Sequence, residues 1–330
     1  MNKSIPYLKP QKEWEWQVAT DVYLAGIGSG SLAVGILMDW LGYLPYSLRP
    51  FVLWGSILVA VGAFFLVLKL GIKRRFLNTI LNPKTSWLSR GFYILSMCII
   101  IGLVILGVSI LPILGISISN WSSLFAILEI IGFVLALSVA IYTGILIRSV
   151  KYVPFWNTPL LPVLFTVSSL FTGSVAVILS TLVYSILTPG NGYPNQLMDT
   201  LTLIARILIV LEAIILGLYL FLRYKAEEEG QSSVRLLLSG KLKYVFWIGV
   251  IVAGFILPII LEGIYSWVHA YQFLPLLTTI LLLIGRFFLR YGIVYAGVKD
   301  QHPLRKFIEN QYDLSTLKDN RGQFLIRRAV

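Results

Sequence analysis

Eight long apolar blocks constrain the fold of this chain more than any other feature of its sequence. A helix rises about 1.5 Å per residue, so a block of about twenty residues crosses a hydrocarbon core about 30 Å thick. Charged, Pro-, Gly- or Asn-rich breaks separate the blocks, which lie at residues 18–38, 51–70, 88–111, 124–147, 160–187, 197–221, 242–265 and 273–298. The sequence therefore predicts an all-α integral membrane protein with about eight transmembrane helices.

The composition excludes a water-soluble globular protein. Of the 330 residues, 57% are hydrophobic and 13% are charged, and the mean hydropathy is +0.83. An ordinary soluble domain carries about 25% charged residues.

Lysine and arginine are distributed very unevenly between the two ends of the predicted helices. Three precede the first helix and seven follow the eighth. Counting residues in a break or within three residues of it, six belong to the break between the second and third helices, two to that between the fourth and fifth, and five to that between the sixth and seventh. The opposite loops contain Arg49 alone. An even number of helices therefore puts both termini and every basic loop on one face, which the positive-inside rule makes cytoplasmic. Topology and lipid contact explain the net charge of +12 without nucleic acid.

A short internal repeat indicates two tandem four-helix bundles. Gly30-Ser31-Leu32-Ala33-Val34 is echoed by Gly173-Ser174-Val175-Ala176-Val177. The predicted organisation is a basic N-terminal segment (1–17), a first bundle (18–150), a second bundle (151–298) and a basic tail (299–330).

Few residues could hold a metal or a haem. Cys98 is the single cysteine, and it lies in an apolar block typical of a buried small hydrophobe. His269 and His302 fall in different connecting segments. We therefore expect no haem and no metal held by this chain.

Three polar residues are predicted at one depth of the first bundle. Asp21, Arg90 and Tyr142 each lie within roughly 10 Å of the basic face at 1.5 Å per helical residue. A carboxylate, a guanidinium and a phenol could together hydrogen-bond the two carbonyls of a quinone and deliver protons to it. The alternative is a structural ion pair between Asp21 and Arg90, with Tyr142 in an aromatic belt.

Glu129 lies about 20 Å from Tyr142 along the same helix, towards the weakly charged face. It is either part of a proton path between that face and the site, with Ser138 between them, or a protonated carboxyl that ties two helices together.

The second bundle carries charges that we interpret mainly as structural ion pairs, with a proton or water path as the alternative. The residues are Arg206, Glu212, Glu262, Arg286 and Arg290.

Several segments resemble the membrane subunits of polysulfide reductase, the NrfD-like family, over about residues 14 to 300. The most specific is Ser86-Trp87-Leu88-Ser89-Arg90-Gly91. Other matching segments are Trp14-Glu15-Trp16, Tyr23-Leu24-Ala25-Gly26, Gly28-Ser29-Gly30, Tyr142-Thr143-Gly144, Pro154-Phe155-Trp156 with Pro159 and Pro162, and Leu289-Arg290-Tyr291.

The resemblance implies a haem-free, quinone-binding bundle, with a menaquinone-like quinone in its first half. It also implies electron exchange with an iron-sulfur subunit, which serves a molybdopterin catalytic subunit. Polysulfide-reducing members work with catalytic subunits outside the cytoplasm, whereas the charge distribution here places the site-bearing face inside, and we follow the charge distribution.

Two other classes of function remain open. A secondary transporter would also suit tandem bundles and buried charges, but it should show matched helix breaks near the midplane, and Pro162 and Pro258 are not such a pair. A membrane anchor without a ligand would leave Glu129 unexplained.

Both termini are predicted on the cytoplasmic side. Reporters fused separately to the two ends should therefore both give the cytoplasmic signal. Opposite signals would mean an odd number of spans, and two external signals would contradict the charge rule for this protein.

Overall fold

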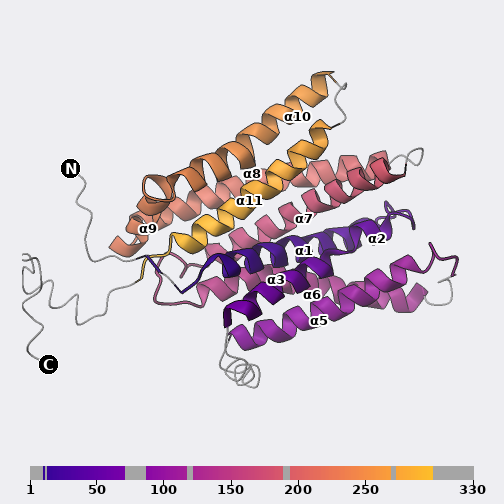
Figure 1. The fold of residues 1–330 in the computed structure, drawn as a ribbon, viewed down its shortest axis with the longest axis horizontal. Coiled ribbons are helices and arrows are strands. Elements are labelled where there is room, and N and C mark those ends of the chain that lie inside the picture. Colours follow the sequence, from indigo (N-terminus) through magenta and orange to yellow (C-terminus); the bar gives the residue numbers. More distant parts are fainter. Residues whose placement is uncertain are drawn as a thin grey trace, which may run out of the picture.

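A computed structural model describes residues 10–11, 13–70, 87–116, 122–188, 194–268 and 273–299. Eight helices in these ranges are long and apolar enough to cross a membrane, which confirms the predicted all-α membrane architecture (Figure 1). The first half consists of α1 (Trp16–Trp40), α2 (Arg49–Val52), α3 (Gly55–Leu70), α5 (Trp87–Ile110) and α6 (Ser122–Arg148). The second consists of α7 (Leu160–Leu187), α8 (Asn195–Lys225), α9 (Glu228–Leu238), the π-helix η2 (Val245–Ile256), α10 (Leu257–Val268) and α11 (Leu274–Tyr295).

Helices α1 and α7 run through the middle of the molecule, with α3, α5 and α6 on one side and α8, α10 and α11 on the other (Figure 1). Helix α1 packs against α3, α6, α7 and α11. As a result 83% of the most apolar 18-residue stretch of α1 is buried, against 28% of the corresponding stretches of α5 and α8. The outer helices face lipid, and α1 is the centre of the fold.

Small residues let α1 and α7 meet backbone to backbone. A Cβ added at Gly30 would lie 1.9 Å from the carbonyl oxygen of Ser169, and one at Gly173 would lie 2.1 Å from the carbonyl carbon of Gly30. Helices in lipid associate through this kind of close packing, because lipid tails are as apolar as the side chains they would replace. The two glycines that the internal repeat aligns therefore touch each other at the interface between the halves.

The acidic run at residues 227–229 forms the start of a helix. An acidic run in a break between two apolar blocks is typical of a solvated loop, but α9 begins at Glu228, and Glu229 is buried. Acidic residues favour a helix N-terminus, where the backbone N–H groups are unpaired. One face of this short helix also buries Val234 and Leu237.

The seventh span changes from π-helix to α-helix just before Pro258. A proline has no backbone N–H, so the α-helical hydrogen bond from Pro258 to the carbonyl of Gly254 cannot form. The guanidinium of Arg286 on α11 donates to that carbonyl instead. Because Pro258 cannot donate to it, the carbonyl of Gly254 is available inside the second half to accept a hydrogen bond from the buried cation of Arg286.

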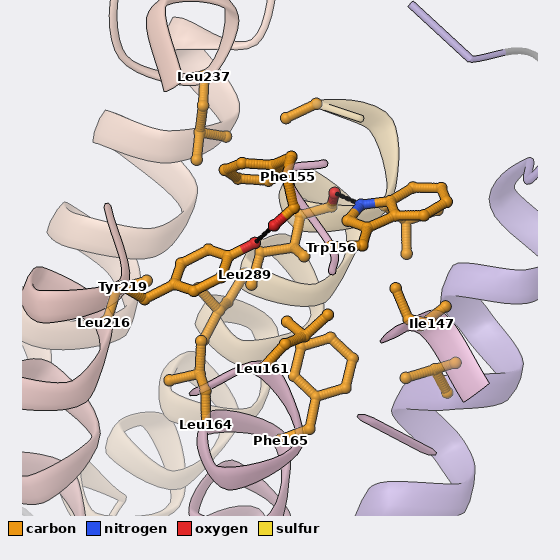
Figure 2. Packing of buried hydrophobic residues seen from close by; sticks show 14 of the residues in the cluster. Ile147, Phe155, Trp156, Leu161, Leu164, Phe165, Leu216, Tyr219, Leu237 and Leu289 are labelled. Carbon is orange, nitrogen blue, oxygen red and sulfur yellow. Dashed lines mark hydrogen bonds between the residues drawn. The ribbon is translucent and has the colours of Figure 1, made fainter. Parts of the chain in front are cut away.

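The connection between the halves is anchored from both sides. The hydroxyl of Tyr219 on α8 donates to the carbonyl of Phe155 at 2.8 Å (Figure 2). The indole of Trp156 donates to the carbonyl of Ile293 on α11 at 2.9 Å. Both Phe155 and Trp156 are fully buried. The segment therefore belongs to the core, and the predicted boundary at residue 150 falls at its start.

The described ends of the protein lie side by side. The backbone N–H of Gln11 donates to the carbonyl of Gly297 at 2.8 Å, and Lys299 pairs with Glu13. Hydrogen bonds from Lys299 and from the hydroxyl of Tyr152 lower the pKa of the Glu13 carboxyl. Partial burial and the bond to Glu13 raise the pKa of Tyr152. An even number of spans brings these two ends to the same end of the bundle.

The contact between α1 and α7 should be intolerant of a single methyl group. We expect Gly30→Ala to lower the free energy of unfolding by about 1–3 kcal/mol, the usual cost of overpacking, because the new Cβ would overlap the carbonyl of Ser169. The measurement is the thermal unfolding midpoint of the detergent-solubilised protein. Gly217→Ala on α8 is the control, since a Cβ there meets nothing within 4 Å. Equal midpoints for the two variants would contradict the proposed contact.

Candidate functional site

Asp21 is a buried carboxyl on α1, about one turn beyond the start of the helix. Its exposed fraction is 3%, and its Oδ1 has no hydrogen-bond partner among the described residues. Helix α3 approaches closely here, because a Cβ at Gly62 would lie 3.0 Å from the backbone carbonyl oxygen of Asp21. A buried acceptor without a partner costs about 1–3 kcal/mol, so this oxygen is a ready site for a donor.

Tyr142 reaches the same region from α6. Its side chain is 3% exposed, and in the part of the sequence that the structure describes its hydroxyl has no hydrogen-bond partner. The ring lies on Gly91 of α5, where a Cβ would come within 1.8 Å of the hydroxyl oxygen. Tyr142 also lies within electrostatic range of the Asp21 carboxyl. The structure thus brings together two of the three residues that the sequence placed at this depth.

Arg90 has a different orientation. It precedes Gly91 on α5, but its side chain is exposed, and its guanidinium carbon lies 4.7 Å from the centre of the Trp87 ring. Arg90 is therefore at the predicted depth, beside the residue that contacts Tyr142, while its charge lies on the outer surface of the bundle.

Asp21 and Tyr142 define what the first half can do chemically. A phenol donates one hydrogen bond, and a carboxyl accepts or donates according to its protonation. Both groups are buried on facing helices with unused hydrogen-bonding capacity. This pair suits a flat ligand with carbonyl oxygens that takes up and releases protons, and a quinone fits that description.

The apolar surface groove in the described residues lies elsewhere. It is lined by residues of α2, of the turn between α2 and α3, and of α7, including Phe51, Trp54 and Val183. Its polar group is the hydroxyl of Ser180, which accepts a hydrogen bond from the Trp54 indole at 3.0 Å. This lining suits an acyl chain and offers no proton donor of the kind present at Tyr142.

A second buried polar centre lies among α8, η2 and α11. Arg286 donates to Glu212 at 2.9 Å, with exposed fractions of 1% and 0% for the two side chains. Its guanidinium also stacks on the rings of Phe171 and Phe255, at 4.3 Å and 4.4 Å. Breaking a buried pair of this kind usually costs about 3–5 kcal/mol, because the remaining charge is left in an apolar surrounding.

Arg290 lies one turn from Arg286 and joins the two halves. Its guanidinium donates to backbone carbonyls of Val22 and Tyr23 on α1, and to the hydroxyl of Ser169 on α7 at 2.8 Å. It occupies the space that a side chain at Gly26 would fill. The Arg290 guanidinium is therefore bound by neutral oxygens, whereas from the sequence we interpreted Arg290 as part of a structural ion pair.

Arg206 and Glu262 pair at 2.5 Å between α8 and α10. Their side chains are 64% and 41% exposed, so this bridge lies on the outer surface of the second half.

Glu129 is buried in the half of the bundle away from Asp21. The indole of Trp40 donates to its Oε2 at 3.0 Å, and its side chain contacts the carboxyl of Asp39. Ser138, which we expected between Glu129 and Tyr142, donates its hydroxyl to the carbonyl of Val134 on its own helix. Sequence reasoning did not identify Asp39, because the predicted first span ended one residue before it.

The candidate metal ligands are dispersed in the described residues. No three His, Cys, Asp or Glu side chains cluster there in a way that could hold a metal ion. Cys98 is fully buried in the core of the first half. His269 and His302 lie outside the described residues.

The fold and these buried residues define a multi-pass helical membrane protein with a polar centre in each half. The sequence matches the family model described as "Polysulphide reductase, NrfD" over residues 6–299, and the protein belongs to that family. The family assignment confirms the resemblance seen in the sequence.

Three relatives are similar over almost their whole length. A polysulfide reductase subunit from Wolinella succinogenes is 27% identical over 86% of this protein and 94% of its own length. A protein NrfD homolog of Haemophilus influenzae is 27% identical over 89% of this protein and 97% of its own length. Protein NrfD of Escherichia coli is 26% identical over 86% of this protein and 94% of its own length.

Proposed function

We propose that this protein is the haem-free membrane subunit of a respiratory oxidoreductase and that it exchanges electrons between a membrane quinone and an iron-sulfur partner subunit. The single observation that carries the proposal is the pair of buried, unsatisfied groups at Asp21 and Tyr142. Family membership and the name of the Wolinella relative, which is one part of a polysulfide reductase, support an assembly of several subunits. The second partner in this proposal is a molybdopterin catalytic subunit.

In this proposal the first half positions and protonates the ligand. A quinone supplies two-electron, two-proton redox chemistry when it is bound. The Tyr142 hydroxyl would donate a hydrogen bond to one carbonyl oxygen, and its position is fixed because α5 has a glycine beneath the ring. The Asp21 carboxyl would hold or release a proton at Oδ1, the oxygen that lacks a partner among the described residues. Arg90 lies on the outer surface beside this site, stacked on the Trp87 ring.

Glu129 belongs to the proposed path of protons between the weakly charged face and this site. It is buried, and its Oε1 has no partner among the described residues. The distance of about 20 Å to Tyr142 requires bridging waters or hydroxyls.

The rival function, a secondary transporter, has less support. The π-helix and Pro258 interrupt the seventh span, whereas α5, the span at the corresponding position of the first half, is α-helical throughout Trp87–Ile110. A matched pair of interrupted helices is the feature that transporters built from repeats typically show.

Replacing the two site groups should reduce quinone turnover without loss of assembly. We expect Tyr142→Phe and Asp21→Asn each to lower the rate of quinone-coupled electron transfer by about tenfold or more, since each removes a hydrogen-bonding or proton-exchanging group. The assay is quinone oxidation or reduction by the intact complex in membranes, with complex assembly measured in parallel.

Tyr224→Phe is the matched control, because Tyr224 is an exposed tyrosine near the end of α8. Its rate should equal that of the wild type. Normal quinone kinetics in both site variants, with normal assembly, would contradict the assignment.

A further inference from the structure

Two carboxyl groups meet where α1 ends beside α6. Asp39 and Glu129 are 9% and 4% exposed, and their side chains are in hydrogen-bond contact with each other. Arg49, at the start of α2, places its Nε 2.8 Å from Oδ1 of Asp39. The indole of Trp40 donates to Oε2 of Glu129 at 3.0 Å. Within the described part of the sequence, Asp39 and Arg49 are the charged groups that interact with Glu129.

The contact between the two carboxyls requires a proton. An ionised carboxylate only accepts hydrogen bonds, so two of them can be joined only if one carries a proton. Burial and the like charge both disfavour full ionisation of such a pair. With one proton the pair has a charge of −1, which Arg49 balances.

The cluster also has an unused acceptor. Oε1 of Glu129 is buried, and the described residues provide no hydrogen-bond partner for it. An unpaired buried acceptor is costly, and the open oxygen can accept a second proton or a hydrogen bond from a water that delivers one.

We propose that Asp39 and Glu129 share one proton and form a proton-exchange site near the face opposite the basic loops, with Arg49 as the counter-charge. The inference rests on the proposed function for its role in quinone chemistry, but the shared proton stands on this geometry alone. Uptake of one proton would leave both carboxyls neutral beside Arg49, and its release would restore the balanced state.

Arg49 connects the cluster to that face. It is the single basic residue in the loops of the weakly charged face. Its side chain is 16% exposed, and its guanidinium carbon lies 4.5 Å and 5.8 Å from the ring centres of Tyr46 and Phe125. The counter-charge therefore touches solvent while the carboxyls do not.

The cluster is aligned with the proposed quinone site. Asp39 follows Asp21 by about five turns of α1, so both buried carboxyls lie on one face of that helix, about 27 Å apart along its axis. Between them, the hydroxyl of Ser31 lies 2.3 Å from the position that a Cβ on Gly55 would occupy, and the buried hydroxyl of Ser56 has no described partner. The Ser31 hydroxyl, which donates to the carbonyl of Gly28 at 3.1 Å, thus lies about midway at the α1–α3 interface, and the Ser56 side chain lies against Gly102 of α5.

The shared proton can be tested by infrared spectroscopy of the purified full-length protein, without quinone turnover. The difference spectrum between the wild type and Glu129→Gln should show the loss of one protonated carboxyl. Asp39→Asn should lose the same signal, because Glu129 alone beside Arg49 becomes ionised. If burial alone keeps Glu129 neutral, its signal will persist in Asp39→Asn, and the proposal is overturned.

Arg49→Gln provides a second test if Asp39→Asn does not fold. Without its counter-charge the pair should bind a second proton, so the protonated-carboxyl signal should increase. An unchanged signal would overturn the shared proton. Asp199→Asn, which removes an exposed carboxyl near the start of α8, is the control and should leave the signal unchanged.

The role in proton exchange needs a separate measurement on the intact complex in proteoliposomes. Glu129→Gln should retain assembly and lose most of the membrane potential generated per quinone converted. Full potential in this variant would overturn the exchange role. If the wild-type complex converts no quinone, the proposed function fails, while the infrared result still decides whether the proton is shared.

Discussion

The close approach of α1 to α7 determines how the rest of the molecule can be arranged. In a membrane, apolar side chains gain little by leaving lipid for one another, so close packing and buried hydrogen bonds must hold the helices together. Gly30 and Gly173 provide the packing, and Arg290 adds hydrogen bonds from α11 to both helices. With α1 fixed at the centre, α3 and α6 are held against its other faces.

This central position gives α1 a chemical role that no outer helix could have. Polar groups on a lipid-facing helix would be exposed to hydrocarbon, but Asp21 and Asp39 are enclosed by neighbouring helices. Asp21 lies within electrostatic range of Tyr142 near the basic face, and Asp39 contacts Glu129 near the opposite face. The second half places its charges differently: Arg286 and Glu212 are paired, and Arg290 is held by backbone oxygens. Among the described residues, Asp21 and Tyr142 bring an unpartnered carboxyl oxygen and an unpartnered phenol into one region of the first half, and this is the physical basis for the proposal that the quinone binds there.

The sequence was sufficient to predict the spans, because each depends on the length of a single apolar block. It predicted that Asp21 and Tyr142 share a depth, and it grouped Arg286 and Glu212 among the structural ion pairs. Depth does not fix rotation about the helix axis, and for this reason the outward orientation of Arg90 could not be foreseen. The contact of Asp39 with Glu129 joins residues far apart in the sequence, and the apolar pattern of a single helix cannot predict such a contact. Helix α9 was missed because its acidic start resembles a loop, while its buried face spans only a few residues.

The most direct test of the central claim is to locate the quinone by covalent labelling. A photoreactive quinone analogue, illuminated with the intact complex in native membranes, should label peptides of α1 and α6 that contain Asp21 and Tyr142. Excess unmodified quinone should abolish that labelling. Labelling confined to helices of the second half, or labelling of α1 and α6 that excess quinone does not reduce, would contradict the account.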